Sequence, residues 1–110
     1  MRNVYNKLVR DNIIDIILKN NEIPGYKILN DEDFIIALKE KFIEESKEII
    51  ETKTKDEVIN ELSDILELVG SLSKQYNISE EELKNKKEGK KTKRGGFDKK
   101  IFLEYSDTKQ

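Results

Sequence analysis

The sequence predicts an all-α protein built around an antiparallel helical hairpin. Proline and glycine are scarce, with one proline and five glycines in 110 residues. Apolar residues recur at the three- and four-residue spacing of helices through most of the chain. Two segments, Thr54–Glu57 and Ser79–Glu82, have the form of a capping box, which marks the start of a helix. These features predict a single helical domain over residues 1–110.

Four helices are expected along the chain, at about residues 11–20, 31–52, 54–76 and 79–91. Asn30 or Asp31 is the expected cap of the second helix. The segment 21–30 contains Pro24-Gly25, a turn signal, and is expected to be a loop. After the fourth helix, Gly95-Gly96 interrupts helical structure. Residues 101–103 are expected to be extended and residues 106–110 to be frayed.

The second and third helices each carry an apolar stripe, and the short linker between them requires antiparallel packing. The stripe of the second helix consists of Phe34, Ile35, Leu38, Phe42 and Ile49. The stripe of the third consists of Leu62, Ile65, Leu66, Val69 and Leu72. A second apolar edge follows Ile36, Ile43 and Ile50 at seven-residue spacing. Because a helix that is apolar on two sides packs against two neighbours, we expect a bundle completed by a homodimer or homotetramer.

The composition excludes several classes of active site. The chain contains no cysteine and no histidine, so disulfides, thiolate or imidazole zinc sites and Ser-His-Asp machinery are impossible. A metal ion would have to be held by oxygen atoms, which favours Mg²⁺, Mn²⁺ or Ca²⁺. No apolar run reaches the length of a membrane span and no signal-peptide pattern is seen, so a cytoplasmic protein without a membrane partner is expected.

Charge is distributed unevenly along the chain. Residues 31–67 include 13 acidic and 5 basic residues, whereas residues 84–100 include 9 basic and 2 acidic residues. This arrangement could bind a cation and a polyanion side by side, or it could form two solvated surfaces of opposite sign. A nucleic-acid partner is not expected, because the acidic body would repel a phosphate backbone.

Two acidic pairs are the strongest candidates for a functional site. Glu45 and Glu48 on the second helix, like Glu61 and Asp64 on the third, are three residues apart and lie on one flank of their helix. Both pairs border the apolar stripes, so antiparallel packing could bring all four carboxylates together. They would then repel one another unless divalent cations neutralised them, and Mg²⁺ suits such a cluster, with Mn²⁺ as an alternative.

Solvated helix faces explain the same spacing equally well. Acidic pairs three residues apart also occur at Glu48/Glu51, Asp64/Glu67 and Glu104/Asp107. The spacing by itself therefore leaves two interpretations open, a metal site and an exposed acidic surface.

A family resemblance favours the metal site. The sequence Glu-x-x-Glu, 12 residues and then Glu-x-x-Asp resembles the signature of the MazG-like all-α nucleotide pyrophosphohydrolases. Residues 6–13 (NKLVRDNI) and 93–101 (KRGGFDKKI) resemble the phosphoribosyl-ATP pyrophosphohydrolase-like branch of that superfamily. These three blocks span almost the whole chain. Ile14 departs from the branch, which usually has proline there, but this position concerns the helix start and not the chemistry.

The resemblance implies a reaction and its residues. The four carboxylates would bind Mg²⁺, and the α–β bond of a nucleoside triphosphate would be split into monophosphate and pyrophosphate. Since the chain has no histidine, a glutamate is the expected base, with Glu45 as first candidate and Glu44 as second. The candidate phosphate ligands are Lys93 and Arg94, with Lys7 and Arg10 as further candidates. For Lys7 and Arg10, an ion pair at the start of the first helix is the alternative.

Three hypotheses of function follow from these patterns. The preferred one is a house-cleaning hydrolase of canonical or modified nucleoside triphosphates. Hydrolysis of phosphoribosyl-ATP in histidine biosynthesis is an alternative within the same chemistry. A non-catalytic, dimerising helical module would explain the helices and charges, but not the acidic pairs at the core edge of both hairpin arms.

Overall fold

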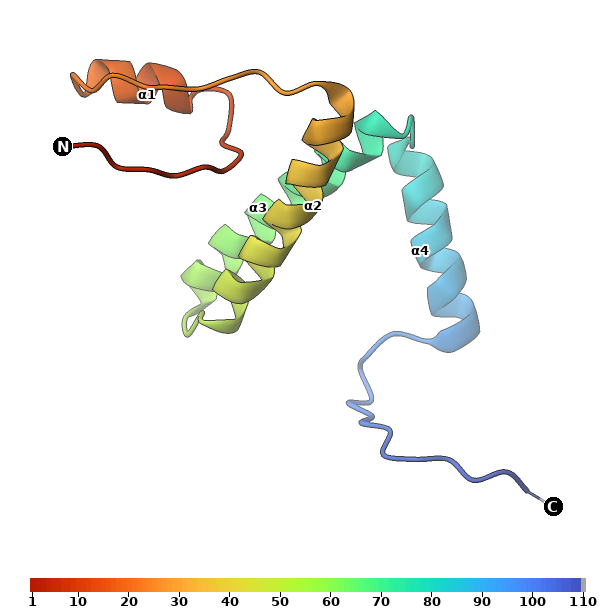
Figure 1. The fold of residues 1–110 in the computed structure, drawn as a ribbon. Helices are drawn as coiled ribbons and strands as arrows, with labels where there is room; N and C mark the ends of the chain where they lie inside the picture. Colours follow the sequence, from red (N-terminus) through yellow and green to blue (C-terminus); the bar gives the residue numbers. More distant parts are fainter. Residues whose placement is uncertain (110) are drawn as a thin grey trace. The chain divides into compact units, whose positions relative to one another are not determined.

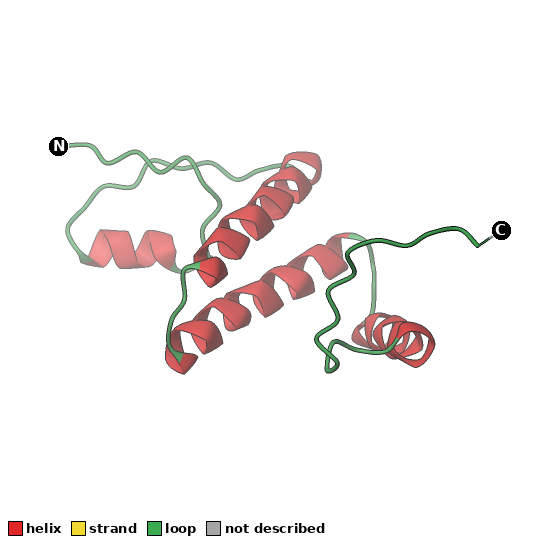
Figure 2. Cartoon of the chain, turned by 90° about the horizontal axis from the view of Figure 1, so that it is seen from below, coloured by secondary structure: helices red, strands yellow, loops and turns green. Residues whose placement is uncertain are grey.

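The computed structural model describes residues 1–109 of the chain. It confirms the all-α prediction, because residues 1–109 form four helices and no strand. The helices are α1 (Ile13–Lys19), α2 (Asp31–Ile50), α3 (Lys55–Gln75) and α4 (Glu80–Arg94), as Figures 1 and 2 show. Helix α1 is shorter than expected and α4 extends three residues further. Residues 101–103 belong to no helix or strand. Of the segment predicted to be frayed, residues 106–109 also lack regular structure, and Gln110 lies outside the described residues.

The helix starts follow the capping patterns in the sequence. The Asn30 side chain accepts a hydrogen bond from the Asp33 N–H at 2.8 Å and caps α2. Thr54 and Glu57 form a reciprocal capping box at α3, in which Thr54 Oγ1 accepts from the Glu57 N–H and Glu57 Oε1 accepts from the Thr54 N–H. Ser79 and Glu82 form the same arrangement at α4. Each box satisfies backbone donors that the first helical turn leaves free.

Helices α2 and α3 form the predicted antiparallel hairpin and are in extensive contact (Figure 1). Leu38 of α2 and Leu68 of α3 are its buried apolar side chains, with 2% and 8% of their surface exposed. Leu68 was not assigned to the predicted stripe, although it lies one helical turn from Ile65 and Leu72. The hairpin therefore has a narrow core, and this core fixes how the two helices face each other.

Part of the predicted stripe of α3 lies outside this core. Leu62 and Leu66 are 46% and 70% exposed, so their assignment to the hairpin contact was wrong. On α2, the second apolar edge of Ile36, Ile43 and Ile50 is also exposed. The stripe on α3 is wider than the area that one neighbouring helix covers, because two helices meet along a narrow line.

The chain divides into two compact units, Met1–Asn77 and Ile78–Gln110. The second unit consists of α4 and the following segment, and none of its described residues is buried. Gly95 ends α4 with a φ of 83°, a left-handed conformation that glycine adopts without strain, and its N–H donates to the Lys91 carbonyl at 2.8 Å. No helix among residues 1–109 has the length and apolar character needed to cross a membrane.

Candidate metal centre

Glu45 is the one charged residue that the fold buries among the described residues, with 5% of its surface exposed. It lies seven residues after Leu38 on α2, which is almost two full helical turns, so it points toward α3 as Leu38 does. A carboxylate at such a position loses most of its hydration and needs compensating partners. Its neighbourhood therefore shows whether the acidic pairs form a site or a solvated surface.

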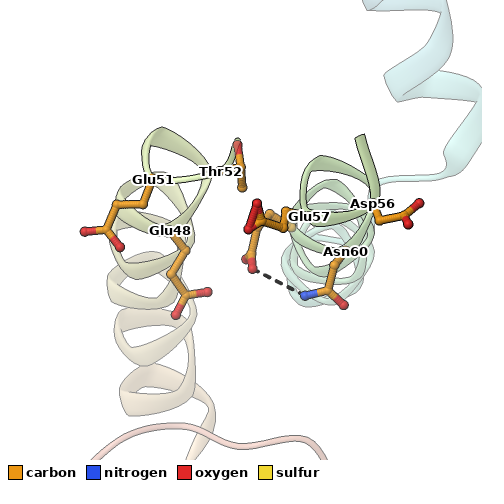
Figure 3. Close-up of a pocket in the computed structure, with 7 residues that line it drawn as sticks. Glu48, Glu51, Thr52, Asp56, Glu57 and Asn60 are labelled. Carbon is orange, nitrogen blue, oxygen red and sulfur yellow. Dashed lines mark hydrogen bonds between the residues drawn. The ribbon is translucent and has the colours of Figure 1, made fainter. Parts of the chain in front are cut away.

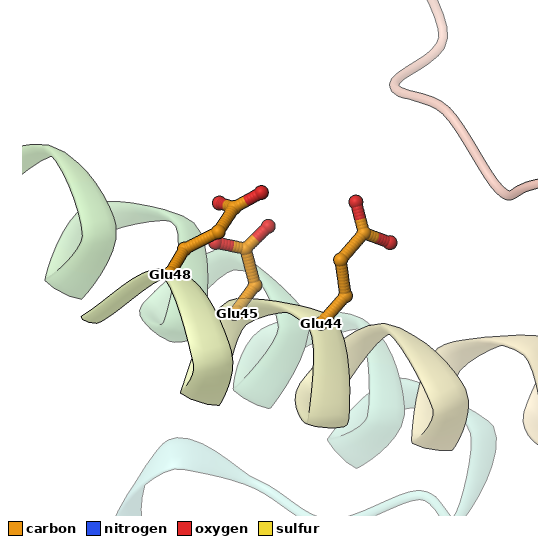
Figure 4. A group of neighbouring side chains, drawn as sticks. All are labelled: Glu44, Glu45 and Glu48. Carbon is orange, nitrogen blue, oxygen red and sulfur yellow. The ribbon is translucent and has the colours of Figure 1, made fainter. Parts of the chain in front are cut away.

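The hairpin brings the predicted carboxylates together from both helices. Carboxylate oxygens of Glu45, Glu61 and Asp64 lie within 4.8 Å of one another. A second group with the same spacing consists of Glu44, Glu45 and Glu48, which project from α2 on one side (Figure 4). Glu45 belongs to both groups and so joins all five side chains into one cluster. We call Glu44, Glu45, Glu48, Glu61 and Asp64 the carboxylate cluster.

Two oxygens of the cluster lack any hydrogen-bond partner. Glu45 Oε2 and Glu61 Oε2 are both inaccessible to solvent and, with both groups ionised, neither receives a hydrogen bond. Buried polar atoms in folded proteins are nearly always paired, because an unpaired one costs about 1–3 kcal/mol. A bound cation or a shared proton would satisfy both oxygens at once. This arrangement distinguishes the cluster from a solvated acidic face.

The proton affinities in the cluster reflect the same crowding. Burial raises the pKa of Glu45 to about 7, helped by a hydrogen bond that protonated Glu45 gives to Glu61 and by repulsion from Glu48 and Asp64. A hydrogen bond to Glu61, followed by burial, also raises the pKa of Glu48. The pKa of Glu61 is lowered, because its carboxylate accepts these hydrogen bonds. Without a cation, the cluster thus holds a proton near neutral pH.

Three basic residues contact the edge of the cluster. Arg10 Nη2 donates to Asp64 Oδ1 at 2.7 Å, although 54 residues separate the two in the sequence. Lys7 Nζ lies 3.6 Å from Glu44 Oε1. Lys41 Nζ lies 3.3 Å from both carboxylate oxygens of Glu44. Lys7 and Arg10 were predicted to bind phosphate or to form an ion pair at the start of the first helix, and the structure pairs them with cluster carboxylates.

Lys41 is the residue that the sequence reasoning missed. It lies three residues before Glu44 on α2, and its side chain is only 19% exposed. Opposite charges three residues apart on a helix commonly pair, so the spacing itself was a usable signal. Lys41 therefore anchors Glu44 at the border of the cluster.

An open pocket of about 500 Å³ adjoins the cluster near the closed end of the hairpin (Figure 3). Glu48 and Glu61 belong to both the cluster and the pocket. Asn60 donates a hydrogen bond from Nδ2 to Glu61 Oε1 at 3.3 Å, so it limits the rotation of that carboxylate. The remaining lining residues are Glu51, Thr52, Asp56 and Glu57. A ligand held at the cluster would have open space on this side.

Lys93 and Arg94 are the last two residues of α4, in the second unit of the chain. Both side chains are exposed, and both line a shallow hollow along α4 with Asn85, Lys86, Gly89 and Lys90. The basic side chains in the last turn of α4 offset the negative end of the helix dipole. The contact of Lys93 and Arg94 with phosphate stays a prediction.

The donor set of the cluster fits a hard divalent cation. Every candidate ligand atom is a carboxylate oxygen, which Mg²⁺ and Mn²⁺ prefer. Glu45, Glu61 and Asp64 supply oxygens from two helices, and the two unpaired buried oxygens belong to Glu45 and Glu61. Glu48 supplies a further, exposed carboxylate.

Comparison with known proteins does not identify the chain. No protein-family model, no curated protein and no solved structure gives a significant match. The functional assignment therefore depends on the residues themselves and on the resemblance of their motifs.

Proposed function

We propose that this protein is a Mg²⁺-dependent nucleotide pyrophosphohydrolase that splits nucleoside triphosphates into monophosphate and pyrophosphate. The observation that supports this most is Glu45, a buried glutamate whose free Oε2 lies within a group of carboxylates from two helices. Three sequence blocks also support the proposal, because their order along the chain resembles that of the MazG-like enzymes with this activity. They are Lys-Leu-Val-Arg-Asp, the two acidic pairs and Arg-Gly-Gly-Phe. We propose a house-cleaning role in the cytoplasm.

The ligands of Mg²⁺ in this proposal are Glu45, Glu48, Glu61 and Asp64. Mn²⁺ would suit the same oxygens. When bound, such an ion neutralises phosphate charge and makes a coordinated water more acidic. The cluster carries five carboxylates, so metal-free protein would repel a triphosphate, whereas the loaded cluster would attract it.

The reaction itself requires one proton acceptor and no covalent intermediate. A water oxygen attacks the α-phosphorus while the bond from that phosphorus to the bridging oxygen breaks, and pyrophosphate leaves with the bond electrons. The water proton passes to a carboxylate. Glu45 is the preferred acceptor, because the chain has no histidine and this carboxylate belongs to both carboxylate groups of the cluster. Glu44, the cluster member that Lys41 contacts, is the second candidate.

Basic residues would hold the phosphates of the substrate. Arg10 presents a planar guanidinium that can contact phosphate through two N–H groups, and Lys7 lies near it on the same segment. Lys93 and Arg94, in the second unit of the chain, are candidate phosphate ligands through their own exposed side chains.

The proposal is tested by incubating the protein with Mg²⁺ and a panel of nucleotides that includes phosphoribosyl-ATP, and measuring pyrophosphate release. Glu48→Gln should lower the rate at least 100-fold, because it removes a ligand charge, and Glu67→Gln, an exposed carboxylate on α3, is the matched control. If neither the wild type nor the control releases pyrophosphate from any substrate, the proposed activity is refuted. Equal rates for Glu48→Gln and wild type would refute the site. Preference for phosphoribosyl-ATP would identify the alternative substrate.

We also propose that copies of the chain associate through the exposed apolar outer faces of α2 and α3. Two buried leucines are too few to stabilise a hairpin alone. Ile43 lies two residues from Glu45 and so projects about 160° away from it around α2. Leu66 lies five residues from Glu61, about 140° around α3. The exposed apolar side chains of the hairpin are Ile36, Ile43, Ile50, Ile59, Leu62 and Leu66.

Sedimentation of wild type and of Leu66→Lys tests this association. The variant should dissociate the dimer or tetramer, since a buried ammonium without a partner is costly. Glu67→Lys, at the neighbouring exposed position, should leave the assembly intact. A monomeric wild type at micromolar concentration would refute the proposed association.

A further inference from the structure

The amino-terminal segment of residues 1–12 contacts the cluster through its basic side chains. Arg10 pairs with Asp64 at 2.7 Å, and Lys7 lies 3.6 Å from Glu44. None of residues 1–12 belongs to a helix, and the side chains of Arg10 and Lys7 are 58% and 45% exposed. These residues are attached to the cluster by charge and carry little packing. We call residues 1–12 the cationic strap.

The strap and a metal ion would compete for the same carboxylate. Asp64 belongs to the group with Glu45 and Glu61 that could hold a cation. Its Oδ1 already accepts a hydrogen bond from the Arg10 guanidinium. A second positive charge at that oxygen would lie within a few ångströms of the guanidinium and repel it. Because both partners are positively charged, each weakens the binding of Asp64 to the other.

We propose that Arg10 and Lys7 are internal counter-ions that the cluster exchanges for divalent cations, and that their release creates the phosphate-binding site. Without metal, Arg10 is bound to Asp64 and has fewer N–H groups available for a substrate. Once Asp64 turns to a cation, Arg10 becomes free while staying close to the cluster. Phosphate then binds tightly only after the metal. This inference rests on the proposed function and adds to it an order of binding, in which the metal precedes the phosphate.

The neighbouring contacts of Glu44 fit such an exchange. Lys41 contacts both oxygens of Glu44 at 3.3 Å, so Glu44 keeps a partner when Lys7 leaves. Arg10 is suited to the transfer because a guanidinium binds carboxylate and phosphate with the same fork of N–H groups. The Arg10–Asp64 pair is also partly exposed, so breaking it costs little.

Nuclear magnetic resonance on the full chain tests the release of the strap with Mg²⁺ alone. The backbone ¹⁵N–¹H heteronuclear Overhauser effect of residues 4–10 should fall when Mg²⁺ is added to EDTA-treated protein, because the strap detaches. It should rise again when pyrophosphate is added to the Mg²⁺-loaded protein. An unchanged value on adding Mg²⁺, at concentrations that shift the resonances of Glu45 and Glu61, would overturn the exchange.

Calorimetry with Arg10→Gln tests the competition by itself. Loss of the competing guanidinium should tighten Mn²⁺ binding about two- to fivefold, the range expected for removing a partly exposed ion pair. The same variant should weaken pyrophosphate binding to the metal-loaded protein at least tenfold. Arg2→Gln removes an equal charge from the strap at an exposed position and should change neither affinity by twofold.

The outcomes separate this inference from the proposed function. If Mn²⁺ binds wild type but Arg10→Gln binds it equally or more weakly, the strap is only a structural contact and the exchange is wrong, while the metal site stands. If wild type binds no metal, both are wrong. Pyrophosphate binding that is equally tight in EDTA would refute the order of binding.

Discussion

Glu45 of α2 and Glu61 of α3 approach each other across the hairpin, and each has a buried Oε2 atom that receives no hydrogen bond while both groups are ionised. Two carboxylates whose oxygens lie within 4.8 Å of each other, away from solvent, are tolerated only when a proton or a cation lies between them. The raised pKa of Glu45 and the lowered pKa of Glu61 correspond to one proton held by this pair. The relationship therefore links folding, proton binding and metal binding at one point.

Replacing Glu45 with glutamine should stabilise the metal-free protein at pH 8 and abolish its stabilisation by Mg²⁺. The neutral amide removes the buried charge and can donate to Glu61, but it cannot neutralise a cation. Thermal unfolding in EDTA and in Mg²⁺ measures both effects. Glu40→Gln, on an exposed position of the same helix, is the control and should respond to Mg²⁺ as wild type does. A Glu45→Gln protein that Mg²⁺ still stabilises would contradict the assignment of Glu45.

Metal-free protein should become more stable as the pH falls from 8 to 6. The pKa of Glu45 is about 7 in the folded chain and near 4.5 in the unfolded chain, so the folded state binds the extra proton in this interval. The expected gain is about 1 kcal/mol. With no histidine or cysteine in the chain, few other groups titrate in this range. Denaturation by urea in EDTA at both pH values measures the gain.

The same experiment on Glu45→Gln supplies the control for this pH dependence. The variant should show a nearly flat stability between pH 6 and 8, because the titrating carboxyl is absent. Below pH 4.5 the wild type should lose stability again, since the lowered pKa of Glu61 favours folding only while that group is ionised. Wild-type stability that rises from pH 6 to 8 without metal would contradict the protonated pair.

The helices and the acidic pairs could be predicted from the sequence, because both depend on local spacing. The capping boxes at Thr54 and Ser79 each involve only four consecutive residues, so the helix starts that they predict are confirmed in the structure. The approach of Glu45 to Glu61 followed from the short linker, which makes the hairpin antiparallel, and from the position of both acidic pairs beside the apolar stripes.

What could not be predicted depends on contacts between distant segments. The pairing of Arg10 with Asp64 joins residues 54 positions apart, and no local pattern indicates it. The exposure of Leu66 was also missed, because an apolar stripe does not say which part of it the neighbouring helix covers. Both cases require the register of packed elements, which hydrophobic periodicity leaves open.

Leu38→Ala should destabilise the protein by about 3 kcal/mol, because it leaves a cavity in a very small core. Leu18→Ala, an exposed position of α1, should cost less than about 0.5 kcal/mol and serves as the control. Urea denaturation with saturating Mg²⁺ measures both. Equal effects of the two substitutions would mean that the hairpin core does not hold this protein together.

Divalent cations should raise the melting temperature of the wild-type protein. At a concentration 100 times the Kd, a ligand that binds only the folded state adds about 2.7 kcal/mol. For a chain of this length, that corresponds to roughly 10 °C. Asp64→Asn should lose most of this increase, since the carboxamide is a weaker ligand and cannot balance the charge of the ion. Asp33→Asn, at the start of α2, preserves the cluster and should keep the full increase. An increase that Asp64→Asn retains would place the cation elsewhere on this acidic protein.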